Sequence, residues 1–273
     1  MLLAACATAP PPAPTEPFVA MTLNVRYGTA KDGPDAWPQR CDQLAARILD
    51  HSPAVLGVQE ALGFQLDFLQ QHLPHHERLG QGRDGGDRGE HAALFVDRRR
   101  FTVVAHGDFW LSPTPDVPAS VGWDAALTRI CTWAQLREIG TERTLWVWNV
   151  HFDHRGAQAR LHAAELLASR VAAAPGVHLV LGDLNTGERT APLDALRRAG
   201  LRDTFRDAHP TATEVGTFHA FRGGMAGEKI DYVLAGAGLA TQSAAILGAP
   251  GPNGRWPTDH HAVVATLALA PQR

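Results

Sequence analysis

Residues 177–187 read VHLVLGDLNTG, an apolar run that ends abruptly in a carboxylate and a carboxamide. The run over residues 177–181 is short and bounded by turn-forming residues, so it predicts a fully buried β-strand. Asp183 and Asn185 follow it, one residue apart. Local chemistry is enough to explain either residue alone, because Asp and Asn bond backbone amides in turns and Gly187 helps the chain to turn. A sharper reading needs support from the rest of the sequence.

The sequence on both sides of this run has the pattern of an α/β domain. We expect helices at residues 40–50, 63–72, 157–171 and 192–199. Besides 177–181, we expect strands at residues 18–25, 54–58, 92–96, 101–111, 130–136, 144–152, 215–219, 230–234 and 262–269. Gly- and Pro-rich loops are expected at residues 80–91 and 112–128. Neighbouring strands mixed with single helices favour two packed mixed β-sheets flanked by helices over a strictly alternating βαβ fold.

The composition indicates one large domain. The chain has 273 residues, of which 45% are hydrophobic, and no shift in composition divides it after residue 18, so we predict a domain over residues 18–273. The formal net charge is -3, from 25 Lys and Arg against 28 Asp and Glu. No global positive field attracts a nucleic-acid backbone, so nucleic acid is not favoured as a partner. Cys41 and Cys131 are expected to be packing residues.

Residues 1–17 have a different character. The sequence LAAC at residues 3–6 resembles the lipobox of bacterial lipoproteins, and a Pro-rich tether follows it. An export signal needs a longer apolar region than the five residues before Cys6, so we interpret the segment as a truncated signal. The expected location is the cell envelope or periplasm, with a lipid anchor on Cys6 as the membrane contact, and the cytoplasm otherwise.

Polar side chains recur at or beside the ends of six apolar segments. They are Asn24, Glu60, His151 with Asp153, Asp183 with Asn185, Asp231, and Asp259 with His260. Each one alone is explained as a turn former, a helix-start residue or a surface histidine. Turn chemistry does not explain six occurrences of these residue types, which are the types that a hard divalent cation and a phosphate group require. The set therefore predicts one shared cleft.

The same segments carry a family resemblance. In order along the chain, TLNVR (22–26), QE (59–60), NVHFDH (149–154), GDLN (182–185), KIDYVL (229–234) and TDHHAV (258–263) resemble the endonuclease/exonuclease/phosphatase superfamily. This superfamily includes deoxyribonucleases, deadenylases and sphingomyelinases. GRDGGDRGEHAALF (82–95), FWLSPTPDVP (109–118) and GWDAAL (122–127) resemble a bacterial branch whose substrates are undefined. The resemblance implies a four-layer α/β sandwich, in agreement with the two mixed sheets.

The resemblance also implies roles for the strand-end residues. Glu60 would be the principal ligand of Mg2+ or Mn2+, with Asn24 and Asp259 near it. Asp183 would activate a water molecule for in-line attack on phosphorus, and Asn185 would hold the phosphate. His151 and His260, the latter paired with Asp231, would donate hydrogen bonds to the phosphate oxygens. The implied activity is a metal-dependent phosphoesterase, and within that class a phosphodiesterase.

Other residues are weaker candidates for substrate binding. Arg83 and Arg129 would clamp a phosphate, because a guanidinium matches it in two-point geometry. The remaining candidates are Asp153, His154, His219 and Trp123, with Trp256 as a further aromatic to test. Arg26 departs from the family pattern, since some members carry a metal-binding carboxylate at that position.

Three alternatives stay open. A nuclease of the same superfamily has local support in the basic turn at residues 98–100. A binuclear zinc hydrolase is suggested by HFDH (151–154), although Asn149 stands where a zinc-binding His is needed. The third alternative is an inactive, tethered binding protein. The predicted partner is a phosphate ester whose identity the sequence does not specify, and the oligomeric state is equally unspecified.

Overall fold

The structure, a computed structural model that describes residues 16–270, is built on two six-stranded mixed β-sheets. The strand order in the first sheet is β11 (Leu239–Ile246), β12 (Val263–Leu269), β1 (Phe18–Asn24), β2 (Val55–Ala61), β4 (His91–Asp97) and β3 (His76–Leu79). The order in the second is β5 (Phe101–Trp110), β6 (Ile130–Glu138), β7 (Thr144–His151), β8 (Val177–Asp183), β10 (Asp231–Ala235) and β9 (Arg202–Asp203). β1 is parallel to β2 and β7 to β8, and the other pairs are antiparallel.

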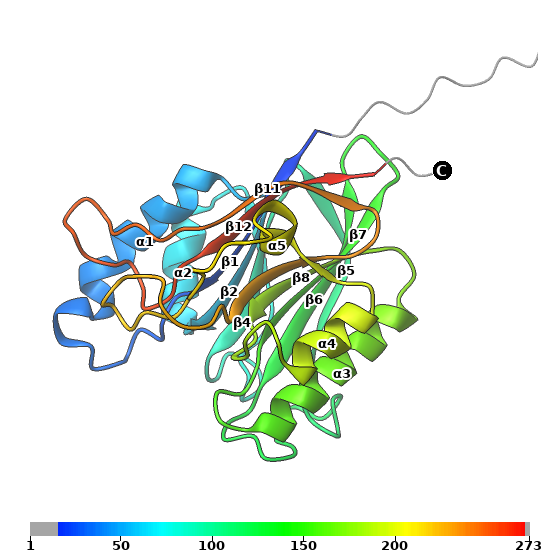
Figure 1. Ribbon diagram of the computed structural model, residues 1–273, viewed down its shortest axis with the longest axis horizontal. Coiled ribbons are helices and arrows are strands. Elements are labelled where there is room, and N and C mark those ends of the chain that lie inside the picture. The colour runs from blue at the N-terminus through cyan, green and yellow to red at the C-terminus, as the bar shows by residue number, and fades with distance from the viewer. Residues whose placement is uncertain (1–15, 271–273) are drawn as a thin grey trace, which may run out of the picture.

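The sheets pack face to face, and helices cover their outer faces (Figure 1). Apolar side chains from both sheets, such as Val55 and Leu145, form the central core. Helices α1 (Trp37–His51) and α2 (Gly63–His72) pack on the first sheet. Helices α3 (Ala157–Ala173) and α4 (Ala191–Arg198) pack on the second sheet. The four-layer α/β sandwich expected from the sequence is therefore confirmed.

Burial on both faces explains why the central strands have almost continuously apolar sequences. β2 and β8 are covered on both faces and are buried along almost their whole length. Such strands are continuous apolar runs, because neither face meets water. Helix α1 instead buries one stripe, which includes Leu44 and Ile48, and each of these side chains contributes about 1.5–3 kcal/mol on full burial.

Most predicted elements are present, with shifted ends. The helix at residues 63–72 matches α2. The predicted strand at residues 215–219 is wrong. That segment forms only an isolated bridge between Phe218 and His260, and Thr217 uses its backbone N–H to bond Glu228 in the neighbouring loop.

Four short or exposed elements were not predicted. They are β3, β9, β11 and helix α5 (Thr204–Ala208), and a 3-10 turn also covers Gly33–Asp35. β11 reads LATQSAAI and keeps much of its surface exposed, so its apolar content is low. Of the two cysteines expected to pack, Cys131 is buried and Cys41 is half-buried against the α1 side of the first sheet.

The predicted signal and tether lie almost entirely outside the described residues, because the description begins at Glu16. The lipobox at residues 3–6 is among the residues not described. Within residues 16–270, no helix combines the length and the apolar character needed to cross a bilayer.

The sheet topology brings the polar strand ends to one edge. β1, β2, β7 and β8 all end there, while β10 and β12 run antiparallel to their neighbours and begin there. The pairing register places Asp183 opposite both His151 on β7 and Asp231 on β10. Side chains directly opposite one another in a sheet are neighbours. Residues far apart in the sequence thus become a contact group.

Candidate active site

A cavity of about 680 Å³ opens at this edge of the sheets. Many of the residues predicted from the sequence line it: Glu60, Arg83, Arg129, His151, His154, Asp183, Asn185, Asp259 and His260. Asn24 and Asp231 are fully buried behind its wall and contact the lining residues. The shared cleft predicted from the strand ends is therefore present in the structure.

Glu60 points into the cavity because β2 is irregular at its end. The register with β4 shifts between Val58 and Ala61, and the φ angle of Glu60 is 62°, a left-handed value that is uncommon outside glycine. One carboxylate oxygen of Glu60 accepts a hydrogen bond from Asn24 Nδ2 at 3.0 Å, and the other accepts one from the Tyr27 backbone N–H at 3.1 Å. A carboxylate has about four acceptor positions, so both oxygens can take a further ligand.

Asn24 connects two carboxylates. Its Nδ2 donates to Glu60 and also to Asp183 Oδ2, each at 3.0 Å, while its Oδ1 accepts the Arg26 backbone N–H at 3.0 Å. The side chain is fully buried. Because all of its contacts are made within the protein, Asn24 fixes the positions of Glu60 and Asp183 relative to each other.

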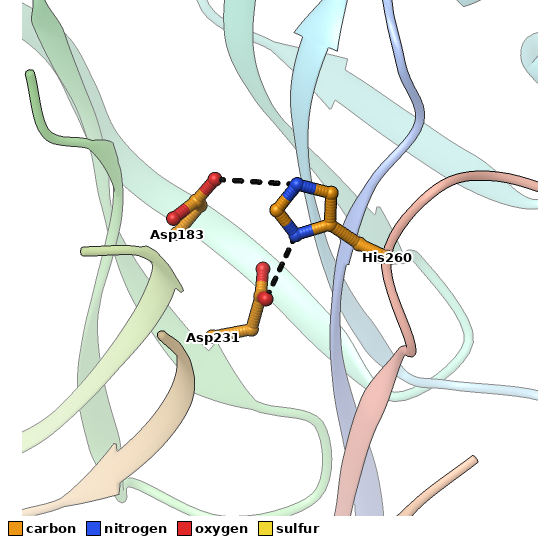
Figure 2. A group of neighbouring side chains, drawn as sticks. All are labelled: Asp183, Asp231 and His260. Atoms are coloured by element: carbon orange, nitrogen blue, oxygen red, sulfur yellow. Dashed lines mark hydrogen bonds and ion pairs between the residues drawn. The ribbon is translucent and has the colours of Figure 1, made fainter. Parts of the chain in front are cut away.

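Asp183 and Asp231 lie on two sides of the His260 ring (Figure 2). His260 Nδ1 is 2.9 Å from Asp231 Oδ2, a hydrogen-bond distance, and His260 Nε2 is 3.9 Å from Asp183 Oδ2. Asp231 thereby holds the imidazole so that its other nitrogen faces Asp183 and the cavity.

Burial and neighbouring charges shift the pKa values of both His260 and Asp183. Burial opposes the charge on His260, but the carboxylates of Asp231, Asp183 and Asp259 together raise its pKa to about 10. Burial, together with the charge of Asp231, raises the pKa of Asp183 to about 7. His260 is therefore a cation at neutral pH, and Asp183 can exchange a proton there.

Two further residues surround Asp183. His151 Nε2 lies 3.6 Å from Asp183 Oδ2, and burial, with the nearby Arg129 and Arg83 guanidinium groups, holds the pKa of His151 well below its ordinary value. His151 is thus a neutral imidazole. Asn185 donates its backbone N–H to Asp183 Oδ1 at 2.9 Å, and its φ of 48° turns the chain sharply after β8. Asp183 and Asn185 therefore form a local turn and also face the cavity.

Arg129 belongs to a buried group beside His151. Its Nε lies 3.4 Å from Asp153 Oδ2, and its Nη2 lies 3.0 Å from His154 Nδ1. Asp153 is itself buried and accepts the backbone N–H groups of Arg155 and Gly156 at 2.9 and 2.7 Å. Although burial acts in the opposite direction, these hydrogen bonds and Arg129 lower the pKa of Asp153 to about 2. Asp153 supports the cavity wall from behind and is not part of its lining.

Arg83 lines the cavity as half of an ion pair. Its Nη1 lies 2.7 Å from Glu90 Oε2, and only 13% of the Arg83 side chain is exposed. The guanidinium of Arg83 is thus mostly buried and fixed by Glu90, and it is not a loop charge that solvent surrounds.

Two predicted substrate contacts lie elsewhere. Trp123 is 38% exposed and packs against His162 of α3, outside the cavity lining. His219 stacks on His261 and contacts Trp256 at a tilted angle, with ring centroids 4.1 and 4.6 Å away, and it lies outside the lining as well. Both rings contact other protein rings and lie outside the cavity lining, so their role as substrate contacts stays a prediction.

Arg26, the departure from the family pattern, faces the acidic side of the cavity. It forms an ion pair with Asp32 at 3.0 Å, and its Nε lies 3.7 Å from Asp259 Oδ2. The guanidinium thus partly neutralises the carboxylate of Asp259. This arrangement leaves Glu60 as the stronger of the two candidate metal ligands.

The donor set fits a hard divalent cation. Glu60 and Asp259 both present carboxylate oxygens to the cavity, and Mg2+ and Mn2+ prefer such ligands while keeping several water molecules. A second group, Asp183, Asp231 and His260, has one ligand atom from each residue within 4.8 Å of the others. Its histidine is already hydrogen-bonded to Asp231, which is buried behind the cavity lining. Glu60 and Asp259 are therefore the candidate ligands for such an ion.

The zinc alternative does not fit the geometry around Asn149. This residue is fully buried between the sheets, where its Nδ2 donates to the carbonyl oxygens of Val58 and Ala93 at 3.0 and 2.8 Å. Its Oδ1 accepts a hydrogen bond from Gln59 at 2.7 Å. Asn149 is thus a structural link between the two sheets and cannot complete a zinc site.

Several lining residues were not predicted from the sequence. They are Tyr27, Asp32, Glu90, Leu127, Phe218, Ala220, Phe221 and Ile230. Glu90, Leu127 and Ile230 lie within the stretches that carry the family resemblance, and Tyr27 directly follows one of them, so these four could have been named from the sequence. Ala220 and Phe221 have φ angles of 50° and 60°, a strained local backbone that no residue type in this stretch indicates.

Comparison with known proteins identifies the family. The model of the endonuclease/exonuclease/phosphatase family matches residues 21–260, which is most of the chain. The chain belongs to this family. Enzymes of this family hydrolyse phosphate esters and generally depend on a divalent metal ion, and membership supports the same general class of hydrolase for this chain.

Solved structures agree with this assignment. A family protein from Bacteroides thetaiotaomicron has a TM-score of 0.87 and 30% sequence identity, over 94% of this chain and 99% of its own. A mannosyl-6-phosphatase from the same species has a TM-score of 0.84 and 30% identity, over 92% of this chain and 99% of its own. These neighbours confirm the bacterial branch that the loop motifs indicated.

A protein of Acanthamoeba polyphaga mimivirus is 27% identical over 127 residues. The match spans 43% of this chain and 46% of the viral protein, less than half the length of either.

Proposed function

We propose that this protein hydrolyses phosphate esters by direct attack of a water molecule that Asp183 activates. The single observation that carries the proposal is the environment of Asp183 at the cavity wall. Asn24 holds its carboxylate at 3.0 Å, and two imidazoles, of His151 and His260, lie 3.6 and 3.9 Å from the same oxygen. A base, a neutral donor and a cationic donor thus converge on one point, as a water attack on phosphorus requires.

Each residue has a distinct task in this proposal. Asp183 accepts the proton of the attacking water, since its pKa near 7 allows it to be a base at neutral pH. His260, kept charged by Asp231, donates to a phosphate oxygen on which negative charge accumulates. His151 donates as a neutral imidazole. Asn185, also on the cavity wall, contacts the phosphate group.

Glu60 and Asp259 would hold the divalent ion, Mg2+ or Mn2+, near the phosphate. When bound, the ion neutralises charge on the phosphate oxygens and so supports in-line displacement. Asn24 positions Glu60 for this task through its 3.0 Å hydrogen bond.

We favour small phosphate esters over nucleic acid as substrates. The basic turn at residues 98–100 is engaged locally: Arg99 pairs with Asp97 at 2.8 Å and Arg100 with Glu138 at 2.6 Å, while Arg98 donates to the Pro74 carbonyl oxygen. Two of the three arginines are thus paired with carboxylates, which weakens the attraction of the turn for a phosphate backbone. The mannosyl-6-phosphatase neighbour supports a monoester substrate, and hydrolysis of a diester stays a prediction to be tested beside it.

The test is a hydrolysis screen with purified protein. Phosphate monoesters, phosphate diesters and single-stranded and double-stranded DNA are incubated with Mg2+, Mn2+ or Zn2+, and released phosphate or cleaved product is measured. We expect hydrolysis of at least one small ester with Mg2+ or Mn2+, and a loss of about 100- to 10,000-fold in kcat for Asp183→Asn.

A matched control is Asp42→Asn, which changes an exposed carboxylate on α1. Asp183→Asn that stays within tenfold of the wild-type rate would contradict the role of this residue. Cleavage of DNA in preference to every small ester would favour the nuclease alternative.

A further inference from the structure

Glu90 lines the same cavity as Asp183 and His260 but has no part in the phosphate chemistry. Burial raises its pKa to about 7, and its ionised form repels a phosphate group. We infer that Glu90, with Arg83 and Arg129 beside it, binds hydroxyl groups of the alcohol part of the substrate. The preferred substrate is then the phosphate ester of a sugar or another polyol. This inference rests on the proposed function and names the substrate class of that site.

The backbone places Glu90 and Arg83 side by side. The loop at residues 80–91 closes as a narrow neck, where Gly82 bridges His91 and the Arg83 N–H donates to the Glu90 carbonyl oxygen at 2.9 Å. The Trp110 indole N–H donates to the Arg83 carbonyl oxygen at 2.6 Å and fastens this neck to β5. Hydrogen bonds therefore fix the backbone from which both side chains extend. A fixed backbone preorganises a binding group.

The polar atoms of this group are only partly used by the protein. Glu90 Oε2 accepts a hydrogen bond from Arg83 Nη1 at 2.7 Å, but Glu90 Oε1 has no hydrogen-bond partner among residues 16–270. Arg83 Nε and Arg129 Nη1 are buried donors without a partner in the same part of the chain. Arg129 is only 4% exposed. A buried donor without a partner is unfavourable, so these atoms are set up for a ligand or for water.

The combination of atoms matches hydroxyl groups. A phosphate group only accepts hydrogen bonds, whereas a hydroxyl group both donates and accepts. A free carboxylate oxygen beside free guanidinium N–H groups can therefore take one hydroxyl as donor and its neighbour as acceptor. The adjoining Leu127 and Phe218 add apolar surface for the C–H groups of such a molecule.

This group lies within reach of the phosphate end of the cavity. Arg83, Glu90, Arg129 and His151 surround one narrow recess, and His151 contacts Asp183. The recess and the main cavity share these four residues. One small molecule can thus place its phosphate at Asp183 and its hydroxyl groups at Glu90.

The test compares substrates and one variant. kcat/KM is measured for hexose 6-phosphates, for their deoxy analogues and for phenyl phosphate, which has no hydroxyl group. For wild-type protein, we expect removal of at least one hydroxyl group to lower kcat/KM tenfold or more. For Glu90→Gln, we expect the ratio of kcat/KM for the hexose phosphate to that for phenyl phosphate to fall at least tenfold. The deoxy analogue that lacks the bound hydroxyl should lose less than the parent sugar.

The control variant is Glu142→Gln, an exposed glutamate in the turn before β7, which should keep the wild-type ratio. If Glu90→Gln does not fold, as judged by thermal melting, the deoxy series on wild-type protein still decides. Equal losses on both substrates in folded Glu90→Gln would overturn the inference, because Glu90 would then only neutralise Arg83. So would a deoxy series that changes kcat/KM by less than threefold throughout.

The inference and the proposed function fail differently. Hydrolysis of phenyl phosphate without hydrolysis of any polyol phosphate overturns the inference alone. A protein that hydrolyses no phosphate ester with any of the metals overturns both.

Discussion

Replacing Asp231 with Asn tests the central electrostatic arrangement of the site. The change removes one negative charge and keeps the size of the side chain. His260 then loses its principal counterion while remaining buried. We expect its pKa to fall from about 10 to near neutrality, because burial disfavours the charged ring and only Asp183 and Asp259 still oppose it.

The size of the effect follows from the geometry. Two unit charges separated by the 2.9 Å between His260 Nδ1 and Asp231 Oδ2 attract by about 6 kcal/mol at an effective dielectric constant of about 20. That energy corresponds to about four pH units in a pKa. At pH 8 the wild-type imidazole is thus charged and the imidazole of Asp231→Asn is mostly neutral. Loss of a charged donor lowers kcat by about 100- to 10,000-fold.

The assay is kcat against pH between 5 and 10, with Mg2+ and the best ester from the screen. The Asp231→Asn profile should lose its activity at a lower pH than the wild type, and activity below that pH should recover in part. Asp42→Asn is the matched surface control, and thermal melting checks that both variants fold. The reasoning would be refuted if Asp231→Asn kept the pH profile of the wild type and a kcat within tenfold of the wild-type value.

Three further predictions concern other parts of the molecule. The wild-type rate should rise as pH increases through about 7, because Asp183 is a base only when deprotonated, and should fall as pH approaches 10, because His260 donates only when protonated. A flat profile over this range would contradict both assignments. EDTA should abolish hydrolysis and added Mg2+ or Mn2+ should restore it, while Glu60→Gln should raise the metal concentration for half-maximal rate at least tenfold; an unchanged metal titration would remove Glu60 from the metal position. Asn149→Ala should lower the free energy of unfolding by about 2–5 kcal/mol, measured by urea denaturation, because it leaves buried groups of both sheets unpaired. A loss below about 0.5 kcal/mol would show that these hydrogen bonds contribute little.

The strand-end residues of the cavity could be named from the sequence, but their contacts could not. Asp183 and Glu60 could be named from the sequence because each follows a strand whose apolar run is unmistakable. That Asn24 bridges them is visible only in the fold, since the two hydrogen bonds span 36 and 159 residues of sequence. The position of Trp123 outside the cavity lining was unpredictable for a related reason, because an aromatic residue in a loop does not reveal which ring it packs against.

The loops were the least predictable part of the cavity. Glu90 stands in a Gly-rich stretch that reads as a solvated turn, yet the closed neck places it beside Arg83 in the cavity wall. The strand expected at residues 215–219 failed because its backbone groups bond to loops and not to a neighbouring strand. The local sequence pattern specifies neither the position of Glu90 nor the absence of a strand at residues 215–219.

By itself, the sequence determined the elements and the layers. Apolar periodicity depends only on which faces are buried, so strands, helices and a sandwich of two mixed sheets could be derived from it. Tertiary structure alone decided the chemistry. The charge of His260 and the raised pKa of Asp183 depend on burial and on charges within 4.8 Å, which residues distant in the chain supply. Such distances exist only when the strand ends have met at one edge of the sheets.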